Sequence, residues 1–482
     1  MIAEPELRRR LLRWLTPLLA LATVVLAPAV ARADFQTGLQ DPEFDGTATA
    51  QQTESGYKTL SATGGSVVRL NAFWYQIAGA APEPGFQATD PADREYQWGV
   101  LDAAVRQASQ RHVRVLLTVS GAPGWAQGPN QPKHKPIGTG AWDPNPTDYG
   151  QFAQAVAKRY SGRFADPLNP GQTLPRVKYI ELWNEENLPA FLAAPNLFDS
   201  YRALLTDGYN GVKAAEPSDK VIFGGLAPVS YLPGTTVSPL KMAAEMMCLR
   251  RVGREFVRLG GGCKAAPFDI FAEHPYTLEA TPTDPAGSYD DVLVADIPKL
   301  RDLLNAARRL HTVAGANHPL WVTEWGWVTK PPDNLGDHFN TAARYVAYAM
   351  YEMWRAGVSV VIWQGITDAS PNQLLGSGLE TKSLRPKPQM QAFTFPFIAS
   401  VAHRKGFAWG RVPGNRRVRV TVQRHTAHGW RRVTAAWTGR DGVFSVRFAA
   451  NGNATYRGHV TGGPNSLPYF SAAIPAQRTH GG

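Results

Sequence analysis

Two glutamates that lie 139 residues apart are the side chains of this sequence best placed to do chemistry. Glu185 lies in the string Trp-Asn-Glu-Glu-Asn of residues 183–187, and Glu324 lies in the string Val-Thr-Glu-Trp-Gly-Trp of residues 322–327. An apolar run precedes each glutamate, so we expect each to end a buried strand. Two carboxyl groups that face each other can cleave a glycosidic bond, because one protonates the leaving oxygen while the other attacks the anomeric carbon.

A glutamate at the end of a strand can also cap the following helix or pair with a basic neighbour at the rim of the fold. The neighbours of these two glutamates favour the catalytic interpretation. Asn184 can hydrogen-bond a sugar hydroxyl, and Trp183, Trp325 and Trp327 supply flat apolar rings against which sugars pack. The sequence therefore predicts that both glutamates are catalytic.

Residues 1–33 have the pattern of a secretory signal. Four arginines between positions 8 and 13 precede an apolar run from Leu15 to Val30, and residues 31–33 read Ala-Arg-Ala. An uncleaved membrane anchor is the alternative, but the run contains two prolines and is short for a bilayer span. We expect cleavage before Asp34 and a mature protein that is secreted or held in the cell envelope.

The chain is long enough, at 482 residues with 44% hydrophobic content, for one large globular domain and a small one. Its formal charge of +11 is unevenly distributed. Residues 404–482 hold thirteen Lys or Arg and a single acid, Asp441, for a net +12, whereas residues 34–403 carry a net −4. The basic excess is therefore a property of the C-terminal segment, and no recognition motif points to a nucleic acid partner.

The chain has two cysteines, Cys248 and Cys263, and an exported protein would join them. Such a bridge would close a loop of about 16 residues and contribute roughly 3 kcal/mol in the loop-entropy model. No pair of histidines lies near these cysteines in the sequence, and no metal-ligand cluster or Gly-rich phosphate loop is visible elsewhere. We therefore expect no metal and no cofactor.

Eight apolar, β-branched runs follow one another in the first 370 mature residues, with starts 31 to 64 residues apart. They are Phe35 to Leu39, Ser66 to Phe73, Val113 to Val119, Val177 to Trp183, Val221 to Leu226, Phe268 to Ala272, Leu320 to Glu324 and Val358 to Trp363. Helical periodicity appears in the gaps, for example around residues 149–160, 297–307 and 345–353. Runs that are apolar throughout suit parallel strands buried on both faces. A closed (β/α)8 barrel, a TIM barrel, is the expected fold, with an open doubly wound sheet as the rival.

The chain changes character after the eighth run. Gln389 to Val401 is expected to form the closing helix of the barrel, despite Pro396. From Arg404 onward, short alternating runs separated by turn residues predict a small antiparallel β-sandwich-like module over residues 404–482. These runs are Val418 to Val422, Val433 to Trp437, Val443 to Phe448 and Tyr456 to Val460.

Residues 34–402 resemble the clan-A glycoside hydrolases, a group of retaining (β/α)8 enzymes that includes cellulases, mannanases, β-xylosidases and exopolysaccharide glycosidases. In that group an Asn-Glu pair ends strand four and a second Glu ends strand seven, which here are Asn184-Glu185 and Glu324. The resemblance implies that Glu185 is the general acid/base and Glu324 the nucleophile of a double displacement on a β-linked glycan. It also implies that no cofactor takes part.

Further positions match the pattern of this group. Arg69, on the second run, resembles the arginine that hydrogen-bonds the nucleophile, and Tyr276, in His274-Pro275-Tyr276, resembles the tyrosine that aligns it. Trp363, at the end of the eighth run, resembles the tryptophan beneath the sugar that is cleaved. Two of these positions have a structural alternative. Arg69 could form a salt bridge at the rim, and His274 could be a hydrogen-bonded structural residue.

Trp74 and Trp125, just past the second and third runs, are candidates for lining further sugar subsites, with packing at the barrel mouth as the alternative. Together with residues 121–126, Trp74 resembles the β-xylosidase-like and exopolysaccharide-degrading branch of the group more than the cellulases. Many relatives have Pro where this chain has Glu186. Because neighbouring strand residues face opposite sides, Glu186 should point away from the site, and its charge could still raise the pKa of Glu185.

Two other functions remain open from the sequence. A carbohydrate-binding protein on a barrel without catalysis would use the same aromatic residues, although the presence of both glutamates argues against it. The basic C-terminal module, with Trp409, Trp430 and Trp437, could contact an anionic polysaccharide or the cell envelope, or it could only pack against the barrel.

Overall fold

The computed structural model describes residues 34–133, 137–230, 236–315, 317–368, 376–414, 416–450, 454–461 and 469–478. The expected secretory signal at residues 1–33 lies outside these ranges, so its prediction stays untested. No helix within the described ranges is long and apolar enough to cross a membrane.

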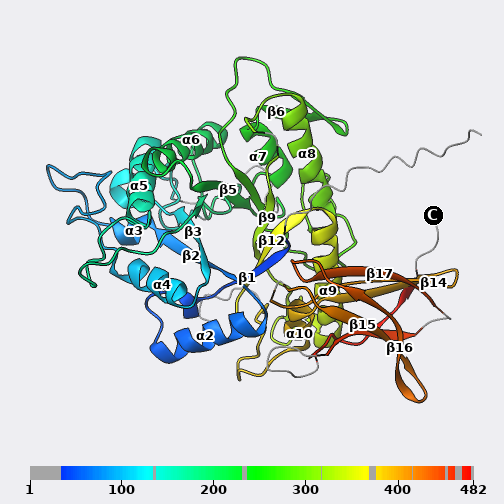
Figure 1. Ribbon diagram of the computed structural model, residues 1–482. Coiled ribbons are helices and arrows are strands. Elements are labelled where there is room, and N and C mark those ends of the chain that lie inside the picture. The colour runs from blue at the N-terminus through cyan, green and yellow to red at the C-terminus, as the bar shows by residue number, and fades with distance from the viewer. Residues whose placement is uncertain are drawn as a thin grey trace, which may run out of the picture. The chain divides into compact units, whose positions relative to one another are not determined.

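Eight parallel strands close into a barrel in the order β1-β12-β9-β8-β5-β4-β3-β2. Figure 1 shows this barrel with helices around it. The strands are β1 (Gln36–Gln40), β2 (Val67–Phe73), β3 (Arg114–Ser120), β4 (Tyr179–Leu182), β5 (Lys220–Leu226), β8 (Ile270–Glu273), β9 (Leu320–Trp325) and β12 (Val358–Gln364). Each of the eight predicted runs overlaps one of these strands, and the predicted closed barrel is confirmed. Glu185 follows the fourth strand and Glu324 lies near the end of the seventh, at the end of the barrel where parallel strands carry catalytic groups.

Helices lie between successive strands and cover the barrel (Figure 1). They are α2 (Ala50–Ala62), α3 (Trp74–Ile77), α4 (Gly99–Gln110), α5 (Pro146–Arg159), α6 (Leu197–Ala215), α7 (Pro239–Met246), α8 (Ile297–Arg309), α9 (Phe339–Arg355) and α10 (Pro388–Thr394). Local sequence sets their starts: the Asn145 side chain accepts hydrogen bonds from two backbone amides at the start of α5, and Pro146 takes its first position. The three helical periodicities seen in the sequence fall in α5, α8 and α9.

The C-terminal segment forms two antiparallel-rich sheets that pack face to face around their own apolar core. One sheet contains β13 (Phe397–Ala402), β14 (Lys405–Arg411), β17 (Val443–Ala449) and β21 (Gln477–Arg478). The other contains β15 (Arg419–Thr426), β16 (Gly429–Trp437), β18 (Thr455–Val460), β19 (Tyr469–Phe470) and β20 (Ile474–Pro475). All four predicted runs of this segment are strands.

At the junction between barrel and module, the expected helix was too long, and Trp409 follows the packing alternative. The helix expected from Gln389 to Val401 ends at Thr394, because Pro396 cannot continue it and residues 397–402 pair as β13 with β14. Trp409 is not available to a ligand, since it is fully buried against Tyr351 and Trp354 of α9. The first strand of the β module therefore begins at Phe397, and the module packs on the barrel through Trp409.

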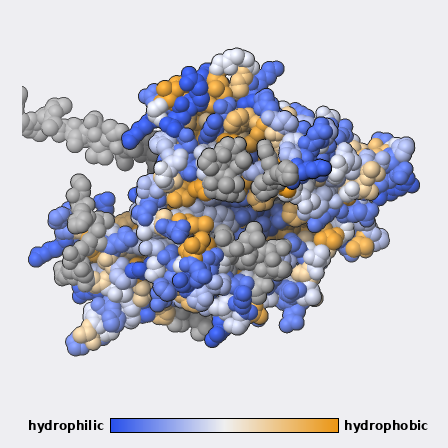
Figure 2. Space-filling model, turned by 180° about the vertical axis from the view of Figure 1, so that it is seen from behind, coloured by the Kyte–Doolittle hydropathy of each residue, from blue (hydrophilic) through white to orange (hydrophobic). Residues whose placement is uncertain are grey.

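Cys248 and Cys263 are joined, with an S–S distance of 2.01 Å. Their loop contains a hairpin of β6 (Leu249–Val252) and β7 (Glu255–Arg258) beside α7. A further two-stranded ribbon, β10 (Thr329–Lys330) and β11 (Asp337–His338), follows the seventh barrel strand. The face seen in Figure 2 is mostly hydrophilic, with separate apolar patches and a hollow near its centre.

Candidate active site

A buried arginine links four of the barrel strands at their carboxyl ends. Arg69 on β2 is 2% exposed, and its guanidinium donates to Glu324 Oε2 at 2.8 Å and to Asn184 Oδ1 at 2.7 Å. It also donates to Glu181 Oε2 at 2.8 Å and to Gln40 Oε1 at 2.6 Å. A buried cation is stable only when its donors are satisfied, so these four acceptors and Arg69 fix one another.

Glu324 receives two directed hydrogen bonds. The Arg69 guanidinium contacts Oε2, and the Tyr276 hydroxyl donates to Oε1 at 3.0 Å. Both bonds are donated to Glu324, so they fix the orientation of its two carboxyl oxygens. Its side chain keeps 17% of its surface exposed, so the carboxylate is held in place yet reachable from the barrel mouth.

Glu185 lies in a sharp turn after β4. Trp183 and Glu185 both have left-handed backbone conformations, with φ of 79° and 44°, and the Glu185 amide donates to Gly225 O at 2.9 Å. Such conformations are uncommon for residues other than glycine and persist when the surroundings hold them. Burial raises the pKa of the Glu185 carboxyl to about 7, although the positive charge of Arg69 partly opposes this rise. Near neutral pH this carboxyl can therefore carry a proton to a leaving group.

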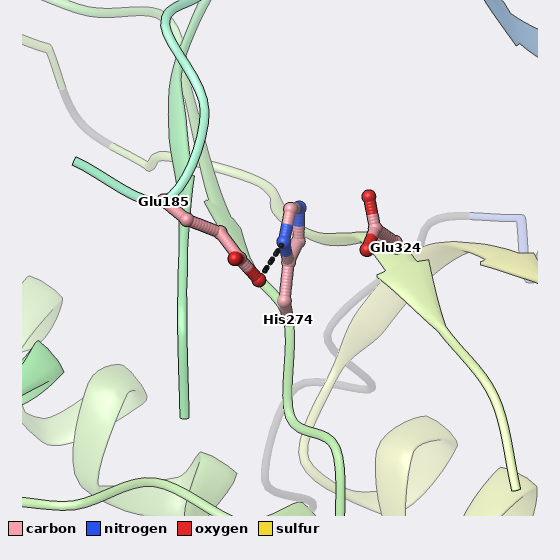
Figure 3. Close-up of side chains that lie close together, drawn as sticks. All are labelled: Glu185, His274 and Glu324. Carbon is pink, nitrogen blue, oxygen red and sulfur yellow. Dashed lines mark hydrogen bonds and ion pairs between the residues drawn. The ribbon is translucent and has the colours of Figure 1, made fainter. Parts of the chain in front are cut away.

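His274 lies between the two glutamates, as Figure 3 shows. Its Nδ1 lies 3.1 Å from Glu185 Oε1, and its Nε2 lies 3.1 Å from Thr323 Oγ1. Burial lowers the pKa of His274 to about 4, so the ring is neutral and holds one donor and one acceptor nitrogen. Gly225 provides space for this ring, because a Cβ there would lie 2.0 Å from Nε2. His274 thus orients the Glu185 carboxyl.

Glu185, His274 and Glu324 each place a polar atom within 4.8 Å of the others. Such a set could bind a metal ion by ligand type alone. Two features oppose this: both ring nitrogens of His274 already have partners, and the Arg69 cation lies 2.8 Å from Glu324 Oε2. The arrangement is better suited to two carboxyl groups acting on a bond between them.

Two further carboxyl groups are buried beneath the site. Glu186 points toward Gly224 and Tyr201, and Glu273 ends β8; both are fully buried. Burial raises the pKa of Glu186 to about 8 and that of Glu273 well above its ordinary value. The sequence left open whether the charge of Glu186 raises the pKa of Glu185. Burial raises that pKa and Arg69 opposes the rise, with no contribution from Glu186.

Trp183, Trp325, Trp327 and Trp363, expected to offer ring faces to sugars, are at most 1% exposed. Trp363 packs edge-on against Trp325 with ring centres 5.1 Å apart, and its Nε1 donates to Ser377 O. In this conformation these rings are therefore packed in the interior and present no open face.

Trp74 and Trp125, for which subsite lining and packing were both open, differ in their exposure. Trp74 is 1% exposed and stacks on Phe152 of α5 at 5.4 Å, which makes it a core residue. Trp125 is half-buried against Trp74, and its Nε1 donates to Ala78 O. The packing alternative holds for Trp74, and only Trp125 retains partial exposure.

Sequence reasoning missed several residues that support the site. Glu181 accepts from Arg69 and, at 2.6 Å, from Thr118 Oγ1. Gln40 contacts Arg69, and Thr323 contacts His274. One usable indication was present: a glutamate inside the apolar run of β4 must have a buried partner.

Comparison with known proteins gave no match to any family model and no match among curated proteins. Solved structures do match. A family 39 glycoside hydrolase from the gut symbiont Bacteroides cellulosilyticus is 16% identical, with a TM-score of 0.51, over 87% of this chain and 81% of that one. A family 39 enzyme from Xanthomonas axonopodis pv. citri is 15% identical, also with a TM-score of 0.51, over 86% of this chain and 91% of that one. At this identity the similarity establishes a shared fold.

Tyr276→Phe removes one of the two hydrogen bonds to Glu324 and leaves the ring in place. A hydrogen bond to a charged group contributes about 1.5–3 kcal/mol, so we expect kcat to fall about 10- to 100-fold. Tyr348→Phe is the matched control, because the Tyr348 hydroxyl contacts the backbone carbonyl of Ala399 in β13. Steady-state kinetics on an activated aryl glycoside would measure both. Equal rates in the two variants would contradict the role of Tyr276.

Glu186→Gln should change how stability depends on pH. The pKa of Glu186 is raised in the folded protein, so the folded state binds more protons than the unfolded state between about pH 4.5 and 8. Stability from this group is therefore lost as pH rises through that window, and the variant should show a smaller fall in Tm from pH 5 to pH 8. Glu255→Gln, at an exposed position, is the control. Parallel Tm curves for wild type and Glu186→Gln would refute this.

Proposed function

We propose that this protein is an exported glycoside hydrolase that cleaves a β-linked glycan with retention of configuration. The observation that carries the proposal is the pair Glu185 and Glu324, whose carboxyl oxygens approach within 4.8 Å. Retaining enzymes place their carboxyl groups about 5–5.5 Å apart, and inverting enzymes about 6.5–9.5 Å apart to admit a water molecule. The separation here favours direct attack by one carboxylate.

The environments of the two carboxyl groups support distinct roles. Glu324 is bonded by Arg69 and Tyr276 and is the group suited to attack the anomeric carbon. Glu185, whose pKa is about 7, is suited to protonate the departing oxygen in the first step. In the second step Glu185 takes a proton from the water molecule that releases the sugar from Glu324. Both steps use the same two side chains and balance the proton.

The residues around the pair are assigned supporting roles in the same proposal. Asn184 is oriented by its bond from Arg69 to Oδ1, which leaves its amide hydrogens directed to a sugar hydroxyl. His274 holds Glu185, and Thr323 holds His274. Similarity to solved glycoside hydrolases is consistent with this assignment, and the sequence pattern of residues 1–33 suggests export.

Azide rescue separates the two roles. A panel of aryl β-glycosides first identifies a sugar that the wild type cleaves, and Glu185→Ala and Glu324→Ala are then assayed on it. Loss of acid/base catalysis costs about 10²–10⁴-fold, and azide should restore turnover in both variants. Glu185→Ala should yield the β-glycosyl azide, because azide attacks the glycosyl-enzyme, and Glu324→Ala the α-azide.

Asp148→Ala is a control for both variants, since this acidic residue lies in the first turn of α5, an element that carries neither glutamate of the pair. Reversed azide products would exchange the roles of the two glutamates. A wild type that binds glycans yet cleaves none of the panel would instead favour a carbohydrate-binding protein.

A further inference from the structure

The sheet that contains β15, β16 and β18 has one covered face and one open face. Val420 and Val422 of β15 and Tyr456 and Val460 of β18 are buried in the core between the two sheets of the module. Because strand side chains alternate, the residues between them point the other way. Arg419 is exposed, and Gln423 and Arg457 are partly exposed, on that outer side.

Strand register brings basic and aromatic side chains together on the open face. Gln423 lies opposite Arg432 on β16 and opposite Arg457 on β18. Arg419 lies opposite Trp437, which is 61% exposed. We call the set of Arg419, Gln423, Trp430, Arg432, Trp437 and Arg457 the cationic face.

Arg457 is held in a fixed position at the centre of the cationic face. Its guanidinium lies 4.1 Å from the ring centre of Trp430 and 4.1 Å from that of Phe470. Its Nε donates to Gln423 Oε1 at 2.9 Å. A guanidinium held by cation–π contacts and one hydrogen bond loses little further freedom on binding, and its remaining N–H groups can contact a ligand.

The charge of the cationic face is not balanced within the described part of the module. There, Arg419, Arg432 and Arg457 form no ion pair with a carboxylate, whereas the barrel contains many such pairs. The single acid of residues 404–482 is Asp441, which lies between β16 and β17 and caps the turn before Val443. Uncompensated positive charge on an open sheet calls for an anionic partner.

We propose that the cationic face binds an anionic polysaccharide whose sugars carry carboxylate groups. Guanidinium groups on neighbouring strands bind carboxylates bidentately, and the exposed Trp437 ring can pack against the apolar face of a pyranose. Single-stranded nucleic acid fits less well, because it stacks successive bases on several open aromatic faces, and Arg457 already covers Trp430, one of the two tryptophans of the cationic face. The module would thereby hold the chain on an acidic glycan matrix.

This inference concerns binding and does not depend on the proposed catalysis. Full-length protein is tested on immobilised polygalacturonate, on the same polymer with its carboxyl groups methyl-esterified, and on oligodeoxythymidylate, each at low and moderate salt. Arg419→Gln/Arg432→Gln removes two charges from the cationic face. Arg440→Gln/Arg447→Gln removes two exposed charges elsewhere in the module and is the matched control.

The wild type should bind polygalacturonate, lose affinity with salt, and bind the esterified polymer weakly. We expect the Kd of Arg419→Gln/Arg432→Gln to rise about tenfold and that of the control by less than about twofold. Arg419→Lys/Arg432→Lys should retain the salt dependence, which shows that loss of charge and not misfolding is the cause. Equal affinities in both glutamine pairs, no binding by the wild type, or tighter binding to oligodeoxythymidylate would overturn the proposal.

Discussion

The candidate site depends on one buried guanidinium. Arg69 joins Gln40 of β1, Glu181 of β4, Asn184 after β4 and Glu324 of β9, so its bonds reach strands on several sides of the barrel. An isolated buried charge costs several kcal/mol, and only satisfaction by surrounding acceptors offsets that cost. These acceptors meet around Arg69 inside the closed barrel, and the bond to Oε2 holds Glu324 in place there.

The same low-dielectric interior separates the behaviour of the carboxyl groups. Glu324 lies beside the Arg69 cation and the Tyr276 hydroxyl, whereas Glu185 faces the neutral imidazole of His274. Burial raises the pKa of Glu185 to about 7. Burial raises the pKa of Glu186 further, to about 8. Their surroundings thus give Glu185 and Glu186 different pKa values, although the two side chains are chemically identical.

Much of the architecture could be predicted from the sequence, because strands buried on both faces are apolar throughout and can be recognised by this pattern. The β4 and β9 runs placed Glu185 and Glu324 at the strand ends without any tertiary information. The local sequence pattern gave a wrong prediction where pairing with another strand determines the secondary structure. Residues 397–402 pair with β14, which no periodicity within Gln389 to Val401 indicates.

Exposure was also beyond the sequence. Trp74 and Trp363 look alike as aromatic residues near strand ends, yet Phe152 covers the first, and Trp325 and Phe393 pack on the second. Glu181 went unnoticed because its importance comes from Thr118 on β3 and Arg69 on β2. Contacts between elements determine which polar residue is structural and which ring is open.

The configuration of the first-formed sugar tests the central claim most directly. Wild-type hydrolysis of a cleavable aryl β-glycoside is followed by proton NMR before the product anomers equilibrate. Direct attack by Glu324, with a carboxyl oxygen of Glu185 within 4.8 Å, predicts that the β-anomer of the free sugar appears first. Initial appearance of the α-anomer would mean a single displacement by water and would contradict the account.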